Sequence, residues 1–472
     1  MGQGQSQPTA RGDPALKLSR TARRFLTELD KLSLAKQQIN EEDVPRLLGI
    51  NGCAGADVYL RVAQFFASYP IGLSKRLDIS QNVPTVIAFF NRNILTPLGI
   101  SDQDYIRLLF LSIAATANKE ETAPSLELVS SLDIEKYYIA YQDLLDLWSL
   151  LVSVYDKAPA AKFDIDVTTK DKRVAERLLK SVKAPVISFD SFHRLMNLYP
   201  AILSSLSIIF DQLLYPDRQE EPAPSIPDIP RDYLCELFLA LGTNTHTMIS
   251  LYNGREHGFS MQALQSKVSD WRTPTLLLVS GHILDTASPL LDIVAPRVPG
   301  VKARKVKRVA FAVYIHGNWR QVGNFGDNET KIIQLSPEFD IYKAVGPSDH
   351  AYFSSKRGLS FGAPLPKNDE PGKPIKIGNL SLFLDSSFEF GVFRNLGPGG
   401  AFVSCSGDNE EYEDRFEINR IELWGIGDKE ELEEQYRKMD LQAKFLQQQR
   451  RRNDPEDRAI LEMAGLVGQY PQ

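Results

Sequence analysis

Cysteine, histidine and long apolar runs are all scarce in this chain of 472 residues. The three cysteines, Cys53, Cys235 and Cys405, are far apart and odd in number, which argues against a disulfide framework and excludes a CxxC metal site. No segment reaches the roughly eighteen consecutive apolar residues of a membrane-spanning helix, and no apolar stretch marks a secretory signal peptide. We therefore expect a reducing compartment, no disulfides, no metal and no cofactor.

A net positive charge is also missing. Lysine and arginine total 54 against 60 aspartates and glutamates, so the net charge is −6. A domain that wraps nucleic acid would be basic, and we expect no direct nucleic-acid contact. The only dense basic run in the second half is KARKVKR (302–308), which precedes the strand-like segment VAFAVY. We interpret it as a solvated strand entry, and an anionic membrane surface is another use for it.

Catalytic and metal-binding motifs are absent as well. The six histidines form no HExxH spacing, and the chain contains neither a calcium loop nor a phosphate loop. Asp385 and Glu389 are the best carboxylate pair, but an extended strand would hold them about 13 Å apart, too far for paired chemistry. Cys405 lies in FVSCSG, where the sequence offers no neighbouring cation or second cysteine for a redox thiol. We predict that the protein is not an enzyme and has no catalytic residues.

Prolines divide the chain in two. Five prolines between residues 216 and 230 prevent both helix continuation and strand pairing. Apolar residues at steps of three and four before this point predict helices, and aromatic and β-branched runs after it predict antiparallel strands. The predicted fold class is α+β, an all-helical domain followed by an antiparallel β-sandwich with flanking helices and a C-terminal helix.

The domain boundaries follow from these patterns. We predict a flexible N-terminus (1–15), a helical domain (16–215), a proline-rich linker (216–229), a β-rich domain (230–427), a C-terminal helix (428–453) and a tail (454–472). Two stretches interrupt the β-rich pattern and are expected to be an insertion and an exposed loop: residues 280–300, and the proline-rich segment GAPLPKNDEPGKPIK (362–376).

The predicted C-terminal helix carries a narrow apolar seam. Leu432, Tyr436 and Met439 recur at steps of four and three, as in a coiled coil, but the seam is too short to be stable alone. We therefore expect this helix to dock on the helical domain or on a partner, with these three residues as the candidate partner contacts.

The N-terminus MGQGQS fits the N-myristoylation pattern, with Gly2 as the acceptor and Ser6 at the required hydroxyl position. One myristoyl chain binds membranes only marginally, so a second signal is needed. Five basic residues follow closely and are the candidate contacts with an anionic membrane: Arg11, Lys17, Arg20, Arg23 and Arg24. The alternative is that these residues are simply the solvent-exposed face of the first helix.

The β-rich half resembles a TLDc domain. Eight segments carry the resemblance in the same order along the chain: LYNGREHGFSMQAL (251–264), TPTLLLV (273–279), GNFGDNET (323–330), SPEFDIYKAVG (336–346), YFSS (352–355), GLSFG (358–362), LFLDSSFEFGV (382–392) and FEINRIELWGIG (416–427). Departures from the family pattern are the 280–300 insertion and the proline-rich loop.

The resemblance implies a function that the residue spacing does not show. TLDc proteins are partners of the vacuolar proton-pumping ATPase and regulate its assembly, so a regulatory protein at the vacuolar or lysosomal surface is expected, cytoplasmic with peripheral membrane attachment. Two other classes remain open on the same resemblance. They are a telomere-linked factor without direct DNA contact, and a protein that protects against oxidative stress.

Overall fold

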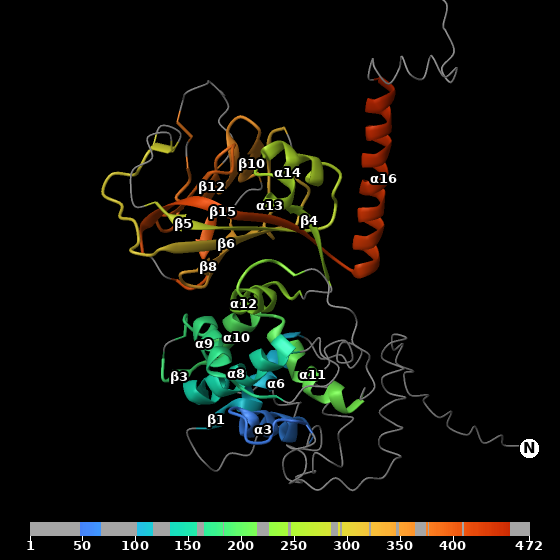
Figure 1. The fold of residues 1–472 in the computed structure, drawn as a ribbon. Helices are drawn as coiled ribbons and strands as arrows, with labels where there is room; N and C mark the ends of the chain where they lie inside the picture. Colours follow the sequence, from blue (N-terminus) through green and yellow to red (C-terminus); the bar gives the residue numbers. More distant parts are fainter. Residues whose placement is uncertain are drawn as a thin grey trace, which may run out of the picture. The chain divides into compact units, whose positions relative to one another are not determined.

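A computed structural model describes residues 48–67, 102–116, 133–157, 165–182, 184–214, 226–243, 247–284, 291–292, 295–320, 322–345, 349–363, 374–375, 377–407 and 410–453. The chain divides into two units. The first contains residues 1–222 and 238–242, and the second contains residues 223–237 and 243–472. Each unit is described by itself below (Figure 1).

The first unit is mainly helical. Its elements are α3 (Ala56–Ala67), α6 (Asp102–Ile113), β1 (Ala115–Thr116), the 3-10 helix η4 (Ile134–Lys136), β2 (Tyr137–Ala140), α8 (Tyr141–Lys157), α9 (Thr169–Leu178), β3 (Val186–Ile187), α10 (Phe189–Leu198) and α11 (Ile202–Leu214). Helix α12 (Arg231–Leu241) lies across the division between the units.

Local sequence explains where these helices begin. The Thr168 hydroxyl accepts a hydrogen bond from the Asp171 N–H, and the Asp171 carboxylate accepts one from the Thr168 N–H, which forms a capping box at α9. Ser188 caps α10 through the Ser191 N–H. Trp148 of α8 is almost fully buried and packs edge-on against Tyr199 at 5.6 Å. Side chains such as these form the core of the unit.

The prediction of an all-helical first domain needs one addition. Strands β1, β2 and β3 form a small antiparallel sheet in which Ala115 lies opposite Tyr138 and Ile139 opposite Ile187. Strands of two to four residues are too short for an alternating pattern to emerge from the sequence.

The second unit is mainly a sheet. Its strands are β4 (Met248–Asn253), β5 (Thr275–Ile283), β6 (Arg308–Ile315), β7 (Asn324–Phe325), β8 (Lys331–Ser336), β9 (Asp340–Ala344), β10 (Ala351–Ser354), β11 (Gly358–Phe361), β12 (Leu380–Leu384), β13 (Phe390–Asn395), β14 (Phe402–Ser404) and β15 (Tyr412–Ile426). Its helices are α13 (Gly254–His257), α14 (Met261–Val268) and α16 (Lys429–Asn453).

The long strand β15 connects the two layers of a sandwich. The strand order is β14-β9-β8-β6-β5-β15-β13-β12-β11-β10-β7, with β4 also paired to β15. The first half of β15 pairs with β13, and the second half pairs with β5 and β4. Phe311 of β6 stacks on Phe393 of β13 with ring centroids 4.6 Å apart, although these strands are not neighbours. The chain therefore folds into the predicted antiparallel sandwich.

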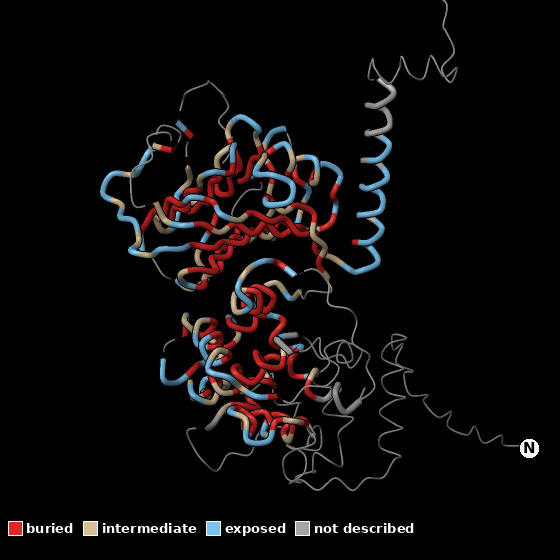
Figure 2. The backbone as a smooth tube through the Cα atoms, viewed as in Figure 1, coloured by how far each residue is buried: buried red, intermediate tan, exposed pale blue. Residues whose placement is uncertain are grey.

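The second layer of the sandwich contains the strands that follow β15 in the strand order, namely β13, β12, β11, β10 and β7. This layer is covered on both faces. Its inner face joins the main core, and its outer face packs under short loop segments. Leu291, Ala295 and Ile375 cover Tyr352, Phe383 and Val392 on that outer face. All five residues of β12 are consequently buried, and Figure 2 shows the strands as almost continuously red. Continuous burial rather than alternation is expected where both faces of a strand are covered.

The predicted insertion begins later than residue 280. Strand β5 extends to Ile283 and keeps its pairing with β6 through His282, which lies opposite Arg308.

Among the described residues, no helix is both long enough and apolar enough to span a bilayer.

The end of the proline-rich segment is anchored to the sheet. The Asp228 carboxylate forms ion pairs with Arg255 at 3.2 Å and with Arg420 of β15 at 2.7 Å. Its backbone N–H donates to Glu422 Oε2 at 3.4 Å. Residues 226–230 therefore pack with the second unit, directly before α12.

Candidate functional site

The first turns of α16 are attached to the second unit. Leu432 is only 2% exposed and belongs to the main sandwich core, and Met439 packs against the same core. The backbone N–H of Arg272 donates to Gln435 Oε1 at 3.0 Å. Leu432 is therefore an internal packing residue. The prediction that Leu432 contacts a partner is wrong, because Leu432 packs into the core of its own unit.

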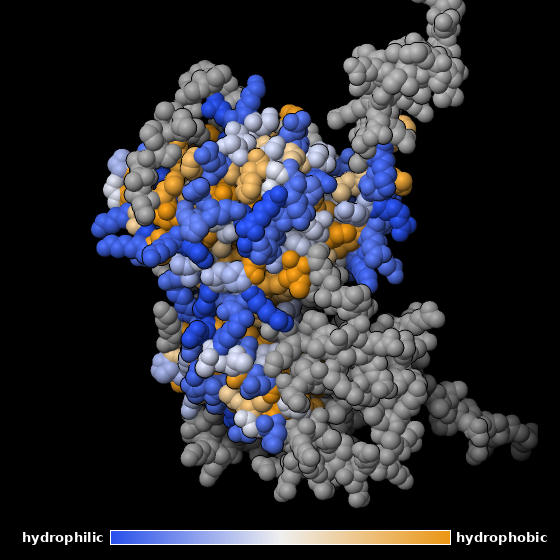
Figure 3. All heavy atoms as spheres, in the orientation of Figure 1, coloured by the Kyte–Doolittle hydropathy of each residue, from blue (hydrophilic) through white to orange (hydrophobic). Residues whose placement is uncertain are grey.

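The opposite face of α16 carries apolar side chains in solvent. Leu441 is 60% exposed and Phe445 is 58% exposed. The seam residue Tyr436, on the side of Leu432, is 42% exposed and stays a candidate partner contact. Leu441 lies about 180° around the helix from Leu432, at ~100° per residue. Figure 2 shows most of α16 in pale blue, and Figure 3 shows isolated hydrophobic side chains among its hydrophilic ones. Leu441 and Phe445 were not predicted as contact residues, because they lie outside the apolar seam that contains Leu432.

The predicted lipid acceptor and the predicted membrane contacts lie outside the described residues. They are Gly2, Arg11, Lys17, Arg20, Arg23 and Arg24. They remain predictions from the sequence.

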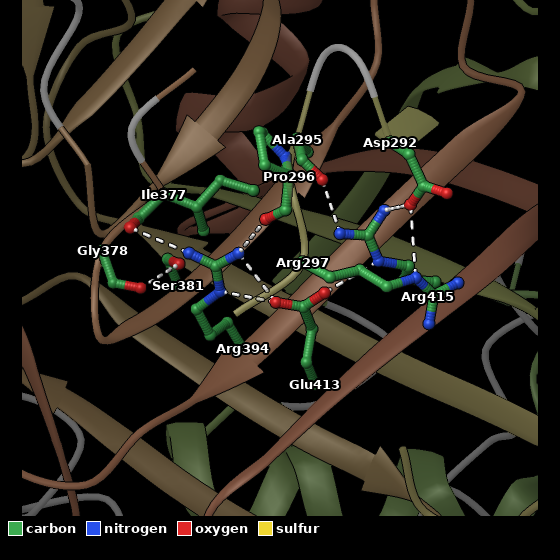
Figure 4. A network of polar contacts seen from close by, with 10 residues as sticks. All are labelled: Asp292, Ala295, Pro296, Arg297, Ile377, Gly378, Ser381, Arg394, Glu413 and Arg415. Carbon is green, nitrogen blue, oxygen red and sulfur yellow. Dashed lines mark hydrogen bonds and ion pairs between the residues drawn. The ribbon is translucent and has the colours of Figure 1, made fainter. Parts of the chain in front are cut away.

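A buried network of charges lies on the outer face of the second layer (Figure 4). Antiparallel register places Arg394 of β13 directly opposite Glu413 of β15. The Arg394 and Arg415 side chains each reach Glu413 at 2.7 Å, from opposite sides of its carboxylate. All three residues are less than 10% exposed. Bidentate and charge-assisted contacts of this kind fix the geometry of the groups they join.

The two arginines also hold neighbouring loop segments. Arg394 donates to the carbonyls of Pro296 and Ile377, and Arg415 donates to the Ala295 carbonyl and binds Asp292 at 2.8 Å. Asp292, Ala295, Pro296 and Ile377 are thereby clamped onto the sheet, as Figure 4 shows. We interpret the network as a structural clamp, because the hydrogen bonds described for both arginines are to carboxylates and backbone carbonyls of the same unit.

A second network lies inside the sandwich. Arg304 pairs with the fully buried Asp414, and its guanidinium stacks 3.8 Å from the Tyr412 ring centroid. Tyr412 donates to Gln334 at 2.8 Å and contacts the Tyr342 hydroxyl. Burial raises the pKa of Tyr412 to about 12 and raises that of Tyr342 well above its ordinary value. Both phenols are therefore neutral hydrogen-bonding groups at physiological pH.

The catalytic alternatives fail on geometry. Asp385 lies in the turn between β12 and β13 and accepts from the N–H groups of Ser387 and Phe390 at 3.0 and 2.6 Å. The predicted extended strand through Asp385 and Glu389 is therefore wrong, although the structural role of Asp385 agrees with expectation. His350 is buried against Phe402, and its Nε2 bonds to the Asp327 carbonyl at 3.1 Å. In the described part of the chain, no three metal-ligating side chains are grouped closely enough to hold an ion.

Cys405 has cations nearby that the sequence did not reveal. Burial raises the pKa of its thiol, and the opposing effect of Lys343 and Lys331 is smaller. A raised pKa disfavours the thiolate that a redox or nucleophilic cysteine needs. The environment of Cys405 therefore argues against peroxidase-like chemistry.

With this geometry established, a comparison with protein-family models decides the identity of the second unit. The model of the TLDc domain matches residues 231–427. Residues 231–427 form a TLDc domain. The TLDc match begins at the first residue of α12 and ends one residue after β15, so it contains both buried networks and leaves α16 as an addition to the domain.

Curated relatives match both the TLDc domain and the residues before it. The chain is 35% identical over 367 residues to "Restriction of telomere capping protein 5" of Kluyveromyces lactis, a match that covers 66% of this chain and 64% of that protein, slightly less than two thirds. The Meyerozyma guilliermondii protein of the same name is 27% identical over 96% of this chain and 95% of its own length.

The clamp residues of the TLDc domain were not predicted from the sequence. In the segment YEDRFEIN, Glu413 and Arg415 share one face of a strand, which normally indicates a face in water. Both are buried because loop segments from elsewhere in the chain cover them. Tyr412 and Phe416, on the other face, were a usable signal, because aromatic residues there indicate a strand in the middle of the sheet.

Proposed function

We propose that this protein is a non-enzymatic, membrane-tethered regulator that binds the vacuolar proton-pumping ATPase and modulates its assembly. The partner comes from the resemblance to TLDc proteins. The protein is cytoplasmic and peripherally attached to the vacuolar membrane. The geometry of α16 is the observation that supports partner binding most directly.

Helix α16 is built to present side chains away from its own domain. Its base is held by Leu432 within the TLDc core, so the direction of the helix is defined. Beyond that base, Leu441 and Phe445 are exposed apolar residues one helical turn apart, on the face away from Leu432. Exposed apolar side chains at this spacing are the usual anchors when a helix docks into a groove of a partner. The lipidated N-terminus would raise the local concentration of this binding surface at the membrane.

Affinity purification from vacuolar membranes tests the proposal. The tagged full-length protein should recover subunits of the proton pump, identified by mass spectrometry. Leu441→Asp with Phe445→Asp should reduce this recovery at least about tenfold, since loss of anchors of this type costs roughly 2 kcal/mol or more. The matched control, Glu433→Ala with Arg437→Ala, changes two exposed polar residues of the same helix and should bind as the wild type does.

Absence of pump subunits from the wild-type eluate would refute the partner. Equal recovery by both double variants would leave the partner in place and refute α16 as the contact.

The alternative is a telomere-linked role without direct DNA contact, which the names of the relatives suggest. Salt-dependent binding of duplex DNA by the purified protein at physiological ionic strength would favour a direct nuclear role instead. A role in protection against oxidative stress would require peroxide turnover that disappears in Cys405→Ser. The raised pKa of that thiol weighs against this outcome.

A further inference from the structure

The basic segment 302–308, here called the basic run, has an ordered alternation. Arg304 faces inward to Asp414, and Val306 packs against the TLDc core. The intervening Lys305 and Lys307 are exposed, as expected for an extended chain whose neighbouring side chains point to opposite sides. Lys302 and Arg308 at its two ends are exposed as well. The basic run therefore presents four cations to solvent and inserts a fifth into the domain.

The backbone of the basic run is fixed in place. Its carbonyls accept hydrogen bonds from the sheet, Lys302 from the Glu413 N–H at 3.1 Å and Lys307 from the Ile283 N–H at 3.0 Å. Arg304 holds the centre through its ion pair with buried Asp414 and its stacking on Tyr412. The exposed cations thus project from a rigid base, and a partner surface would not need to order this backbone on binding.

The four exposed cations have no acidic partners among the described residues. Some exposed arginines elsewhere in that part of the chain do have such partners, as Arg61 has Asp143 and Arg255 has Asp228. In the basic run, the only side-chain hydrogen bond given by an exposed cation joins Arg308 to His282 at 3.2 Å. The exposed cations of residues 302–308 are therefore a concentrated positive surface in a chain of net charge −6, and such a surface attracts anionic partners.

We propose that the basic run is an electrostatic contact with an anionic lipid bilayer. Three of its four exposed cations are lysines, whose compact, hydrated charges suit a diffuse layer of negative headgroups. None of the exposed large apolar side chains in the described ranges lies in the basic run, so it offers no platform for stacking nucleic-acid bases. Exposed Glu410 and Glu411 border the run near Lys302 and leave its net charge positive.

This inference deepens the proposed membrane tether and rests on it only for the location of the protein. The N-terminal signal would bring the chain to the membrane, and the basic run would then orient the TLDc domain on the surface. Four clustered cations lie within the range at which polybasic segments bind anionic membranes.

Vesicle co-sedimentation of the full-length, unmyristoylated protein tests the basic run directly. Vesicles of phosphatidylcholine with about 30% phosphatidylserine should bind the protein, and vesicles of phosphatidylcholine alone should not. Lys302→Ala with Lys305→Ala and Lys307→Ala should lower binding at least about tenfold at ~0.1 M salt, and the difference should shrink at ~0.5 M salt. The triple arginine variant at the same three positions should bind as the wild type does.

The matched control is Lys172→Ala with Arg173→Ala and Lys356→Ala, which removes the same charge from exposed sites elsewhere. Its binding should stay within about twofold of wild type, because these charges are not part of the proposed contact and a loss due to net charge alone would appear in both variants. Each measurement is repeated in the Arg20→Glu, Arg23→Glu, Arg24→Glu background, which separates the basic run from the N-terminal residues.

Unchanged vesicle binding by the triple alanine variant in that background would overturn the inference, as would an equal loss in the matched control. Binding of the run to duplex DNA without binding to vesicles would assign it to nucleic acid and would likewise overturn the lipid contact. The assay contains neither myristate nor proton pump, so its result is independent of whether the proposed function holds.

Discussion

At the residue scale, the TLDc domain depends on charges removed from water. Glu413 accepts from Arg394 and Arg415, and all three side chains are nearly fully buried. Removing one partner of a buried ion pair leaves the others without compensation, which costs far more than losing a surface pair. The clamp thus makes the positions of Asp292, Ala295 and Pro296 sensitive to a single carboxylate.

Substitution of Glu413 by glutamine should expose this dependence. The change leaves the buried Arg394 without a counter-charge and leaves Arg415 with only the partly exposed Asp292, and we expect the free energy of unfolding to fall by about 3–5 kcal/mol. Glu417→Gln is the control, because Glu417 is an exposed residue of the same strand and should shift stability by less than ~0.5 kcal/mol. Urea unfolding of both variants measures the difference, and equal midpoints would show that the clamp contributes little.

Glu422 provides a pH-dependent test. It is 2% exposed, and burial raises its pKa despite the hydrogen bonds from Trp424 Nε1 and the Asp228 N–H. As the pH rises above the ordinary value of 4.5, the unfolded chain loses this proton before the folded chain does. The residue therefore makes the folded state progressively less favourable as pH rises through that window.

Replacing Glu422 with glutamine removes the titration and keeps an oxygen that accepts from Trp424. We expect the melting temperature of the glutamine variant, relative to wild type, to rise between about pH 4 and pH 8. Thermal unfolding at several pH values measures this. A difference that stays constant, or that falls as pH rises, would contradict the direction assigned to the pKa.

At the scale of elements, α16 combines two roles along its length. Its first turns contribute Leu432 and Met439 to the TLDc core. Its exposed face carries Leu441 and Phe445 together with charged pairs such as Lys438 with Glu434 and Lys444 with Asp440. Pairs four residues apart support a helix by only a few tenths of a kcal/mol, so the docked base is the main source of its stability.

Alanine substitutions should separate these roles. Leu432→Ala removes a buried side chain and should lower the free energy of unfolding by about 2–4 kcal/mol. Leu441→Ala should change it by less than ~0.5 kcal/mol, because that side chain is in solvent. Chemical denaturation of the purified proteins measures both values. A large loss in Leu441→Ala would mean that the exposed face packs within the chain.

At the scale of the whole molecule, the proposed function joins a lipidated N-terminus to a TLDc domain more than two hundred residues later. One myristoyl chain binds membranes with K on the order of 10⁴ M⁻¹, which is reversible. Each basic residue near an anionic surface adds at most about 1 kcal/mol. Lipid, N-terminal basic residues and partner would therefore each contribute a measurable part of the attachment.

Mutation of the acceptor glycine tests the lipid contribution. Gly2→Ala should release the protein from vacuolar membranes into the cytosol without changing its melting temperature, since only the lipid is lost. Arg20→Glu with Arg23→Glu and Arg24→Glu should release it partly, and more at high salt. Fractionation of cell lysates measures the membrane-bound share. Continued membrane association of Gly2→Ala would show that a protein partner, and not the lipid, holds it there.

The sequence by itself determined the fold class, the β-sandwich and the apolar seam of α16. These features rest on local patterns, such as the β-branched residues in KIIQLS and the helical spacing of Leu432 and Met439. Tertiary structure alone decided which side chains are buried. The charged face of Glu413 and Arg415 lies under segments distant in sequence, Leu432 closes its own domain's core, and Arg304 turns inward from a basic run. Burial depends on what covers a residue, and partners such as Asp292 for Arg415 and Arg304 for Asp414 come from more than a hundred residues away, beyond the reach of any local pattern.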